Sequence, residues 1–143
     1  MTENIGFIIP IGGAEEKVRD ASILRKFGEI AGGEDARIAI IPTASRLKGT
    51  ADRYINLFAE LGIPGAFSLP YGTRADCKRS DWLDKLSNAT AVFMTGGNQL
   101  RLSTLLGGTR VADMIRERNA TDGLHVAGTS AGASIMAEHM IAY

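Results

Sequence analysis

The segment ARIAIIP, residues 36–42, is a short apolar run that ends in proline. Four further β-rich runs share this character: IGFIIPI (5–11), GAFSLP (65–70), TAVFMTGG (90–97) and LHVAGTS (124–130). Several of them are apolar at successive positions instead of alternate ones, as is typical of strands that are covered on both faces. The five runs therefore predict the strands of a buried, mostly parallel sheet.

Helical patterns lie between the predicted strands. Over residues 51–62 the apolar side chains recur at i, i+3, i+4 and i+7, which places them on one helical face. Residues 16–33 show a similar stripe, and Ser80 is expected to be the N-cap of a short helix over residues 80–88. The expected stripes are Tyr54, Leu57, Phe58 and Leu61; Ile23, Phe27 and Ile30; and Val111, Met114, Ile115 and Arg118. This β-α alternation predicts an α/β fold with a sheet between two layers of helices.

The composition limits the classes of partner. A chain of 143 residues fits one domain, and its 16 basic and 16 acidic residues cancel, which argues against nucleic acid or an anionic membrane as a partner. The single cysteine, Cys77, excludes an internal disulfide, and its polar neighbours predict an exposed bystander thiol. The N-terminus lacks the pattern of a signal peptide, and no apolar run approaches the roughly 18 residues of a membrane span. We therefore expect a cytoplasmic location.

Four predicted strands end in unusual residues: IGGAEEK (11–17), IPTASR (41–46), MTGGNQ (94–99) and AGTSAGA (127–133). Each segment alone could simply be a tight strand-to-helix turn, for which glycine is the usual solution. The carboxyl ends of parallel strands, however, meet at one edge of the sheet, where α/β proteins bind their ligands. The four segments together favour a functional site at that edge.

The last of these segments matches the G-x-S-x-G pattern over residues 128–132, with Ser130 at its centre. This pattern is typical of a sharp strand–turn–helix elbow that exposes a nucleophilic serine, because only small neighbours fit the turn. A purely structural turn is the alternative. If Ser130 is a nucleophile, the backbone N–H of Ala131 at the start of the next helix is suited to stabilising an oxyanion.

The MTGGNQ segment is the best source of a second oxyanion donor. Glycine at positions 96 and 97 lets a backbone N–H approach a substrate carbonyl. The amide side chains of Asn98 and Gln99 suit substrate carboxylates or amides. Capping of the helix over residues 98–106 is the alternative role for both of them, and it is the stronger alternative for Asn98.

A serine nucleophile needs a base, and the chain has only two histidines. His125 precedes Ser130 by five residues in an extended strand, which separates them by about 16 Å. His139 follows Ser130 by nine residues, about 13 Å along a helix. We expect both histidines to be packing or surface residues. Either the protein is not a hydrolase, or its base comes from polypeptide outside these 143 residues, which we favour.

The segments IGGAEEK, IIPTAS, FMTGGNQL and AGTSAGAS, in this order and spacing, resemble the serine peptidase family that contains cyanophycinase and peptidase E. The resemblance covers essentially the whole chain and matches the N-terminal half of cyanophycinase. It implies a three-layer α/β sandwich similar to class I glutamine amidotransferase domains, a flavodoxin-like arrangement. It also implies hydrolysis of cyanophycin, a polyaspartate whose β-carboxyls carry arginine, to β-Asp-Arg dipeptides. No metal or organic cofactor is expected.

The resemblance also assigns site residues. It makes Ser130 the nucleophile and gives the oxyanion donors as Gly97 and Ala131, while Asn98 and Gln99 would line the substrate pocket. The family often has aspartate where this chain has Asn98, and also where it has Glu16. The family's catalytic histidine and its acidic partner lie further along than residue 143.

We therefore expect residues 1–143 to be the N-terminal part of a single α/β hydrolytic domain. A missing C-terminal segment or a partner chain would complete it and carry the catalytic histidine and acid, and an oligomer is expected. Two alternatives remain at this point: an α-aspartyl dipeptidase similar to peptidase E, and a catalytically inactive binding or regulatory subunit of the same fold. A nucleotide-binding domain is disfavoured because IGGAEE does not complete G-x-G-x-x-G.

Overall fold

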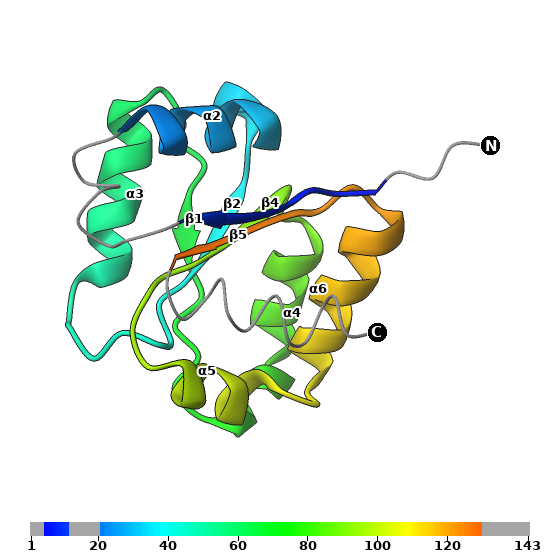
Figure 1. The fold of residues 1–143 in the computed structure, drawn as a ribbon. Helices are drawn as coiled ribbons and strands as arrows, with labels where there is room; N and C mark the ends of the chain where they lie inside the picture. The colour runs from blue at the N-terminus through cyan, green and yellow to red at the C-terminus, as the bar shows by residue number, and fades with distance from the viewer. Residues whose placement is uncertain (1–4, 12–20, 130–143) are drawn as a thin grey trace.

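The computed structural model describes residues 5–11 and 21–129, and this part of the chain forms a five-stranded sheet in the order β1-β5-β4-β2-β3 (Figure 1). Every pair of neighbouring strands is parallel. The strands are β1 (Ile8–Ile11), β2 (Ile38–Ile41), β3 (Phe67–Ser68), β4 (Ala91–Met94) and β5 (His125–Thr129). Each strand lies inside one of the five predicted runs, so the parallel sheet is confirmed.

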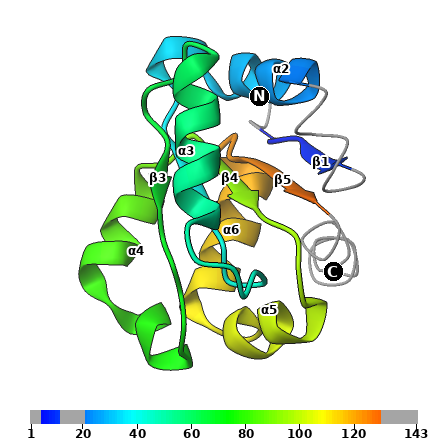
Figure 2. The ribbon, with the colours of Figure 1, turned by 90° about the vertical axis from the view of Figure 1, so that its left-hand side faces the viewer.

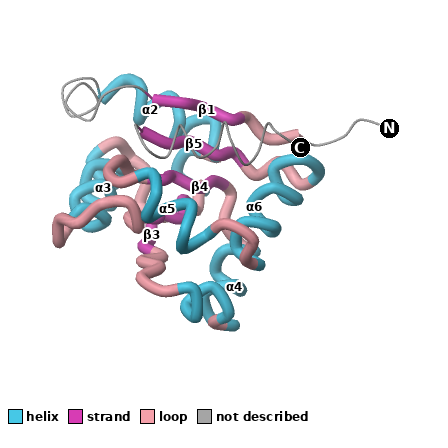
Figure 3. The backbone as a smooth tube through the Cα atoms, turned by 60° about the horizontal axis from the view of Figure 1, so that its bottom comes forward, coloured by secondary structure: helices cyan, strands magenta, loops and turns pink. Residues whose placement is uncertain are grey.

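Helices cover both faces of the sheet (Figures 1 and 2). One layer contains α2 (Ala21–Ala31) and α3 (Thr50–Glu60). The other contains α4 (Ser80–Ser87), α5 (Gln99–Leu106) and α6 (Arg110–Thr121), while the short 3-10 helices η1 (Gly33–Asp35) and η2 (Arg74–Lys78) lie in connections. The tube in Figure 3 shows the strands side by side between these layers. The expected three-layer α/β sandwich is therefore confirmed, and no helix in the described ranges has the length and apolarity to cross a membrane.

The continuous apolar character of the strands follows from this sandwich. In β2, Ile38 and Ile40 pack into the core under α2 and α3, whereas Ala39 and Ile41 pack into the core on the other face. All four are fully buried. Because successive side chains of a strand point to opposite faces, a strand covered on both sides needs apolar residues at every position.

The predicted apolar faces of α3 and α6 are confirmed, whereas the buried face of α2 differs from the predicted one. Tyr54 and Phe58 of α3 are buried, as are Val111 and Ile115 of α6. In α2, however, Ile23 is 38% exposed, and the inner face is built from Leu24, Phe27 and Ala31. The expected Ile23 position was therefore wrong by one residue, because the helix is rotated to place Leu24 and Ala31 against the sheet.

Two expectations, for the cap at residue 80 and for the exposure of residue 77, were wrong. Ser80 is the first residue of α4 and Arg79 takes the N-cap position, with no side-chain hydrogen bond to the helix. Cys77 is only 1% exposed: η2 turns its side chain into the core, where the thiol donates to the Leu105 carbonyl at 3.5 Å. A capping box between Thr73 and Asp76 starts this short helix and sets its orientation.

The connections that follow β2 and β4 lead to opposite faces of the sheet. Strand β2 is followed by α3 on one face of the sheet, whereas β4 is followed by α5 and α6 on the opposite face (Figure 2). The two strands are neighbours, with Ile41 paired to Met94 at their carboxyl ends. Loops that leave adjacent strands toward opposite faces open a crevice, and α/β sheets bind ligands at such a switch point.

Candidate active site

The loop that follows β2 is held in shape by its own hydroxyl groups. The buried Thr43 donates its hydroxyl hydrogen to the carbonyl of Tyr71 at 2.8 Å. The hydroxyls of Ser45 and Thr50 lie 2.8 Å apart, and Thr50 also donates to the carbonyl of Leu47 at 3.1 Å. The loop therefore follows a fixed path from β2 to the first turn of α3.

The loop that follows β4 passes directly against the loop after β2. Gly97 has a φ of 144°, a conformation that is rare for residues with a side chain. A Cβ atom at this position would also overlap the carbonyl group of Ala44. Position 97 therefore needs glycine for both its backbone conformation and the close approach of the two loops.

Asn98 ties the two loops together and starts the next helix. Its backbone N–H donates to the carbonyl of Ala44 at 2.9 Å. Its side-chain oxygen accepts a hydrogen bond from the N–H of Arg101 at 3.2 Å, which caps α5. The capping role is thus present, and the side-chain NH₂ of Asn98 has no partner among the described residues, so its substrate role stays a prediction.

A cavity of about 400 Å³ lies between these loops and the first turns of α3, at the switch point of the sheet. We call it the switch-point cavity. Two arginines, Arg46 and Arg53, contribute to its lining, and none of the described residues that line it is acidic. The buried Thr95 also lines it, and its hydroxyl has no hydrogen-bond partner in the described part of the chain. This set of groups favours an anionic ligand.

The backbone of the same cavity offers two donors. The N–H groups of Gly96 and Gly97 have no acceptor among residues 5–11 and 21–129. Unengaged backbone donors at a strand end can stabilise negative charge on a ligand oxygen. The N–H of Gly97 is the one that the sequence predicts as an oxyanion donor, and that role stays a prediction.

Tyr54 forms part of the cavity wall as a neutral side chain. Burial raises the pKa of its hydroxyl to about 12, and the charge of the nearby Arg53 acts in the opposite direction with a smaller effect. The guanidinium of Arg53 lies over the Tyr54 ring, 5.9 Å from its centre. Because Tyr54 stays protonated at neutral pH, the charged groups among the described residues of this wall are the two arginines.

The predicted nucleophile follows the strand beside β4. Strand β5 pairs with β4, with Gly128 opposite Met94, and ends at Thr129. Ser130 and Ala131 come next in the sequence and lie outside the described residues, as do Glu16 and His139. Gln99 is the first residue of α5. The sheet order therefore brings the ends of β2 and β4 together and sets β5 beside them.

His125 begins β5, the strand that ends at Thr129. It is the first residue of the strand, its Nδ1 accepts a hydrogen bond from the N–H of Phe7 at 3.0 Å, and its ring stacks on that of Phe7. Burial lowers the pKa of this imidazole. The expected packing role of His125 is therefore confirmed.

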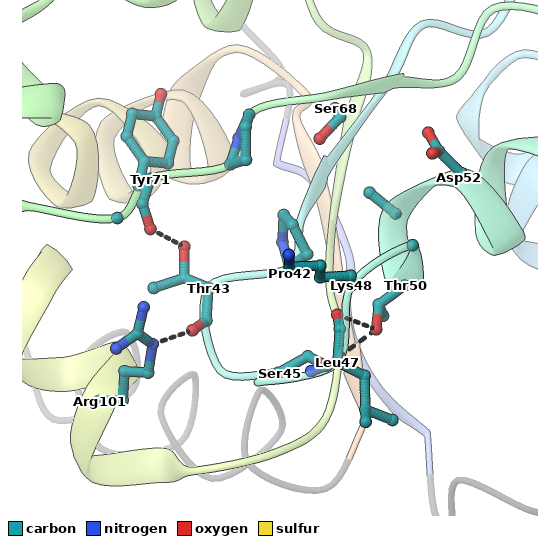
Figure 4. A pocket seen from close by; sticks show the side chains of 14 residues that line it. Pro42, Thr43, Ser45, Leu47, Lys48, Thr50, Asp52, Ser68, Tyr71 and Arg101 are labelled. Atoms are coloured by element: carbon teal, nitrogen blue, oxygen red, sulfur yellow. Dashed lines mark hydrogen bonds between the residues drawn. The ribbon is translucent and has the colours of Figure 1, made fainter.

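A second cavity, of about 320 Å³, lies on the other side of the residue 45–50 loop (Figure 4). Arg101 borders it and donates from Nε to the carbonyl of Thr43 at 2.8 Å. Lys48 and Asp52 also line it, so its charges are mixed. In the described ranges, no group of three or more His, Cys, Asp or Glu residues could hold a metal ion.

Sequence reasoning missed three residues of the switch-point cavity: Arg46, Arg53 and Thr95. Arg46 and Thr95 fall within the quoted strand-end segments, which is the signal that could have found them. Arg53 lies on the polar side of a predicted helix. Its place at the site depends on β2 being the neighbour of β4, which no local pattern indicates.

Comparison with known proteins identifies the family. The model of peptidase family S51 matches residues 7–143. Cyanophycinase from Geminocystis herdmanii is 44% identical over 136 residues, which cover 94% of this chain and 50% of the relative. Cyanophycinase from Synechococcus elongatus is 43% identical over 138 residues, covering 96% of this chain and 43% of the relative. The chain thus spans about half the length of the curated relatives it matches.

Two solved structures share the fold. A peptidase from an acI-B1 Actinobacterium superposes with a TM-score of 0.75 at 23% identity, over 93% of this chain and 57% of that one. A putative peptidase E protein from Listeria monocytogenes superposes with a TM-score of 0.65 at 22% identity, over 92% of this chain and 62% of that one. Because the family model and the curated relatives both cover nearly all of the sequence, the chain belongs to peptidase family S51.

Proposed function

We propose that this chain is the nucleophile-bearing part of a serine peptidase that hydrolyses cyanophycin to β-Asp-Arg dipeptides through an acyl-enzyme on Ser130. The observation that carries the proposal is the switch-point cavity in a member of peptidase family S51. It is lined by the loop after β4, and β4 is the neighbour of the strand that precedes G-x-S-x-G in the sequence. The curated relatives at 43–44% identity are cyanophycinases, which favours the branched polymer over an aspartyl dipeptide as substrate.

The chemistry proceeds in two steps. The Ser130 oxygen attacks the peptide carbonyl while a histidine takes its proton, and the N–H groups of Gly97 and Ala131 donate to the resulting oxyanion. The imidazolium then protonates the leaving amine, and the C–N bond breaks to leave an ester on Ser130. Water, deprotonated by the same histidine, hydrolyses this ester and restores the serine.

The base is supplied by polypeptide outside these 143 residues. His125 is excluded by its place at the start of β5 and its hydrogen bond to Phe7. The curated relatives are about twice as long as this chain, which supports a second segment or partner chain that carries the histidine and its acid. A cytoplasmic location and an oligomeric assembly stay predictions.

The test is release of β-Asp-Arg from purified cyanophycin by the native assembly of this chain, together with labelling by a fluorophosphonate. Both should be present in the parent protein and lost in Ser130→Ala, whose turnover should fall by a factor on the order of 10⁶. The matched control is Ser134→Ala, the next serine in the sequence. It should keep both labelling and turnover.

Three outcomes would contradict the proposal. A Ser130→Ala protein that retains most of its turnover would reject the nucleophile. A parent assembly that is neither labelled nor active would favour an inactive binding subunit. An assembly that is labelled at Ser130 but cleaves only Asp-X dipeptides would replace the polymer with a small substrate.

A further inference from the structure

We propose that Arg46 and Arg53 form a subsite in the switch-point cavity, and that this subsite binds a free carboxylate of the peptide substrate. The inference rests on the proposed function for the identity of the ligand, but it concerns residues that neither the sequence motifs nor the family match assigns. It starts from the charges of the cavity, which are two guanidinium groups with no acid among the described lining residues.

The two arginines are available to a ligand. Neither forms an ion pair with a described residue, although four other arginines of the described chain, Arg79, Arg110, Arg116 and Arg118, each pair with an aspartate or glutamate. Within the described ranges, the guanidinium of Arg53 lies over the ring of the buried Tyr54. A guanidinium offers parallel N–H donors that match the two oxygens of a carboxylate.

The floor of the cavity adds neutral donors. Thr95 is 1% exposed and its hydroxyl has no partner among the described residues, which is a costly state for a buried polar group in the absence of a ligand. The N–H groups of Gly96 and Gly97 are likewise without acceptors among the described residues. The two guanidinium groups, the N–H groups of Gly96 and Gly97 and the Thr95 hydroxyl can all donate, and none of the described lining residues carries a negative charge. An anion therefore fits the cavity and a cation does not.

The charge pattern also separates the two ends of the ligand. Each unit of the proposed substrate carries a carboxylate and an arginine side chain. A positive cavity accepts the carboxylate and repels the guanidinium, so the arginine side chain of that unit must point away from Arg46 and Arg53. The neighbouring cavity, where Asp52 accompanies Lys48 and Arg101, lacks this one-sided charge.

The test measures binding, not turnover. β-Asp-Arg dipeptide is titrated calorimetrically into the native assembly carrying Ser130→Ala. Arg46→Gln and Arg53→Gln should each raise the Kd about tenfold, which corresponds to the loss of one charge-assisted hydrogen-bonded contact. Arg46→Lys and Arg53→Lys, which keep the charge, should recover part of the affinity. The matched control is Lys48→Gln, which removes a cation of the same loop outside this cavity and should leave Kd unchanged.

Modified dipeptides identify the carboxylate. Amidation of the arginine carboxyl and amidation of the aspartate α-carboxyl give two ligands that each lack one anion. The carboxylate bound by the subsite is the one whose amidation raises Kd in the parent but has no further effect in the Arg46→Gln/Arg53→Gln double variant, which lacks both guanidinium groups.

The outcomes separate this inference from the proposed function. Equal binding by the parent and both glutamine variants, the same loss in Lys48→Gln, or no measurable dipeptide binding by the parent overturns the subsite. If Ser130 is not labelled while the arginine variants lose affinity, the catalytic proposal fails and the subsite stands. Because both arginines are exposed, circular dichroism should show a native fold for every variant.

Discussion

At the floor of the switch-point cavity, Thr95 carries a buried hydroxyl that has no partner in the described part of the chain. A buried polar group that has lost its water and gained no hydrogen bond destabilises the folded state. Stability and ligand binding therefore favour different side chains at position 95. An apolar side chain stabilises the protein without ligand, whereas a hydroxyl stabilises the complex with ligand.

Thr95→Val should change stability and ligand affinity in opposite directions. It keeps the shape of the side chain and removes the unsatisfied hydroxyl, so the free energy of unfolding should rise by about 1 kcal/mol. Affinity for β-Asp-Arg should fall about fivefold, because one donor to the ligand is lost. Thermal unfolding and calorimetric titration measure the two effects.

Thr95→Ser is the matched control for this prediction. It retains the hydroxyl and loses a buried methyl group, so it should lower stability while keeping the affinity. A valine variant that loses stability without losing affinity would show that the hydroxyl has no role toward the ligand.

At the scale of elements, the strands and the Asn98 cap of α5 could be predicted from the sequence, whereas the start of α4 could not. The strands are short apolar runs, and local composition is sufficient to locate them: β2 and β4 are buried at every position, while the edge strands β1 and β3 are partly exposed. The start of α4 depends on the path of the chain as it leaves η2. Arg79 takes the N-cap position, at which serine is a common residue. The burial of Cys77 among polar neighbours likewise follows from the orientation of η2, which no local pattern sets.

The strand β5 is linked to the segment before β1 by His125, which makes this link sensitive to pH. Its Nδ1 accepts from the N–H of Phe7 and can do so only while that nitrogen is unprotonated. Burial lowers the pKa of the imidazole in the folded protein. The unfolded chain therefore binds the proton more readily, and the stability from this group is lost as pH falls below the unfolded pKa of about 6.5.

His125→Asn should reduce this pH dependence. The asparagine side-chain oxygen can replace Nδ1 as the acceptor and does not titrate. Between about pH 7 and pH 5, the Tm of the parent protein should fall more steeply than that of the variant. Equal slopes would refute the assignment, whatever the difference in absolute Tm, since the variant also loses the ring stacking on Phe7.

At the scale of the whole molecule, one aromatic side chain joins the sheet to a helix layer. Phe93 of β4 lies 5.9 Å from Phe27 of α2, and 4.9 Å and 5.8 Å from Tyr54 and Phe58 of α3, measured between ring centres. It is fully buried at the centre of the sheet. Its packing therefore holds both helices of this layer against the strands that frame the cavity.

Phe93→Leu should lower the free energy of unfolding by about 1–2 kcal/mol, because the smaller side chain leaves space among three rings. The matched control is Phe7→Leu, at a ring that is 60% exposed, where the change should stay below about 1 kcal/mol. Urea unfolding of both variants measures the difference. Equal losses would show that the aromatic cluster adds no stability beyond that of an exposed ring.

The candidate site could be predicted only in part for a reason that belongs to this scale. The segments at residues 41–46 and 94–99 mark two strand ends, but no pattern in the sequence indicates that β2 lies beside β4. That adjacency builds the switch-point cavity and brings Arg53 of α3 to it. Local patterns therefore identify strand-end residues of the site, and the sheet order selects the helix residue that joins them.

The inward turn of Cys77 has a practical consequence for labelling experiments. It is the chain's only cysteine, its thiol lies against the Leu105 carbonyl, and burial raises its pKa, which disfavours the reactive thiolate. Alkylating reagents reach it only when η2 lifts from the core. A fluorophore can thus be attached at an introduced cysteine on an exposed position such as Ser87 without first replacing the native residue, and slow reaction at Cys77 itself reports the opening of η2.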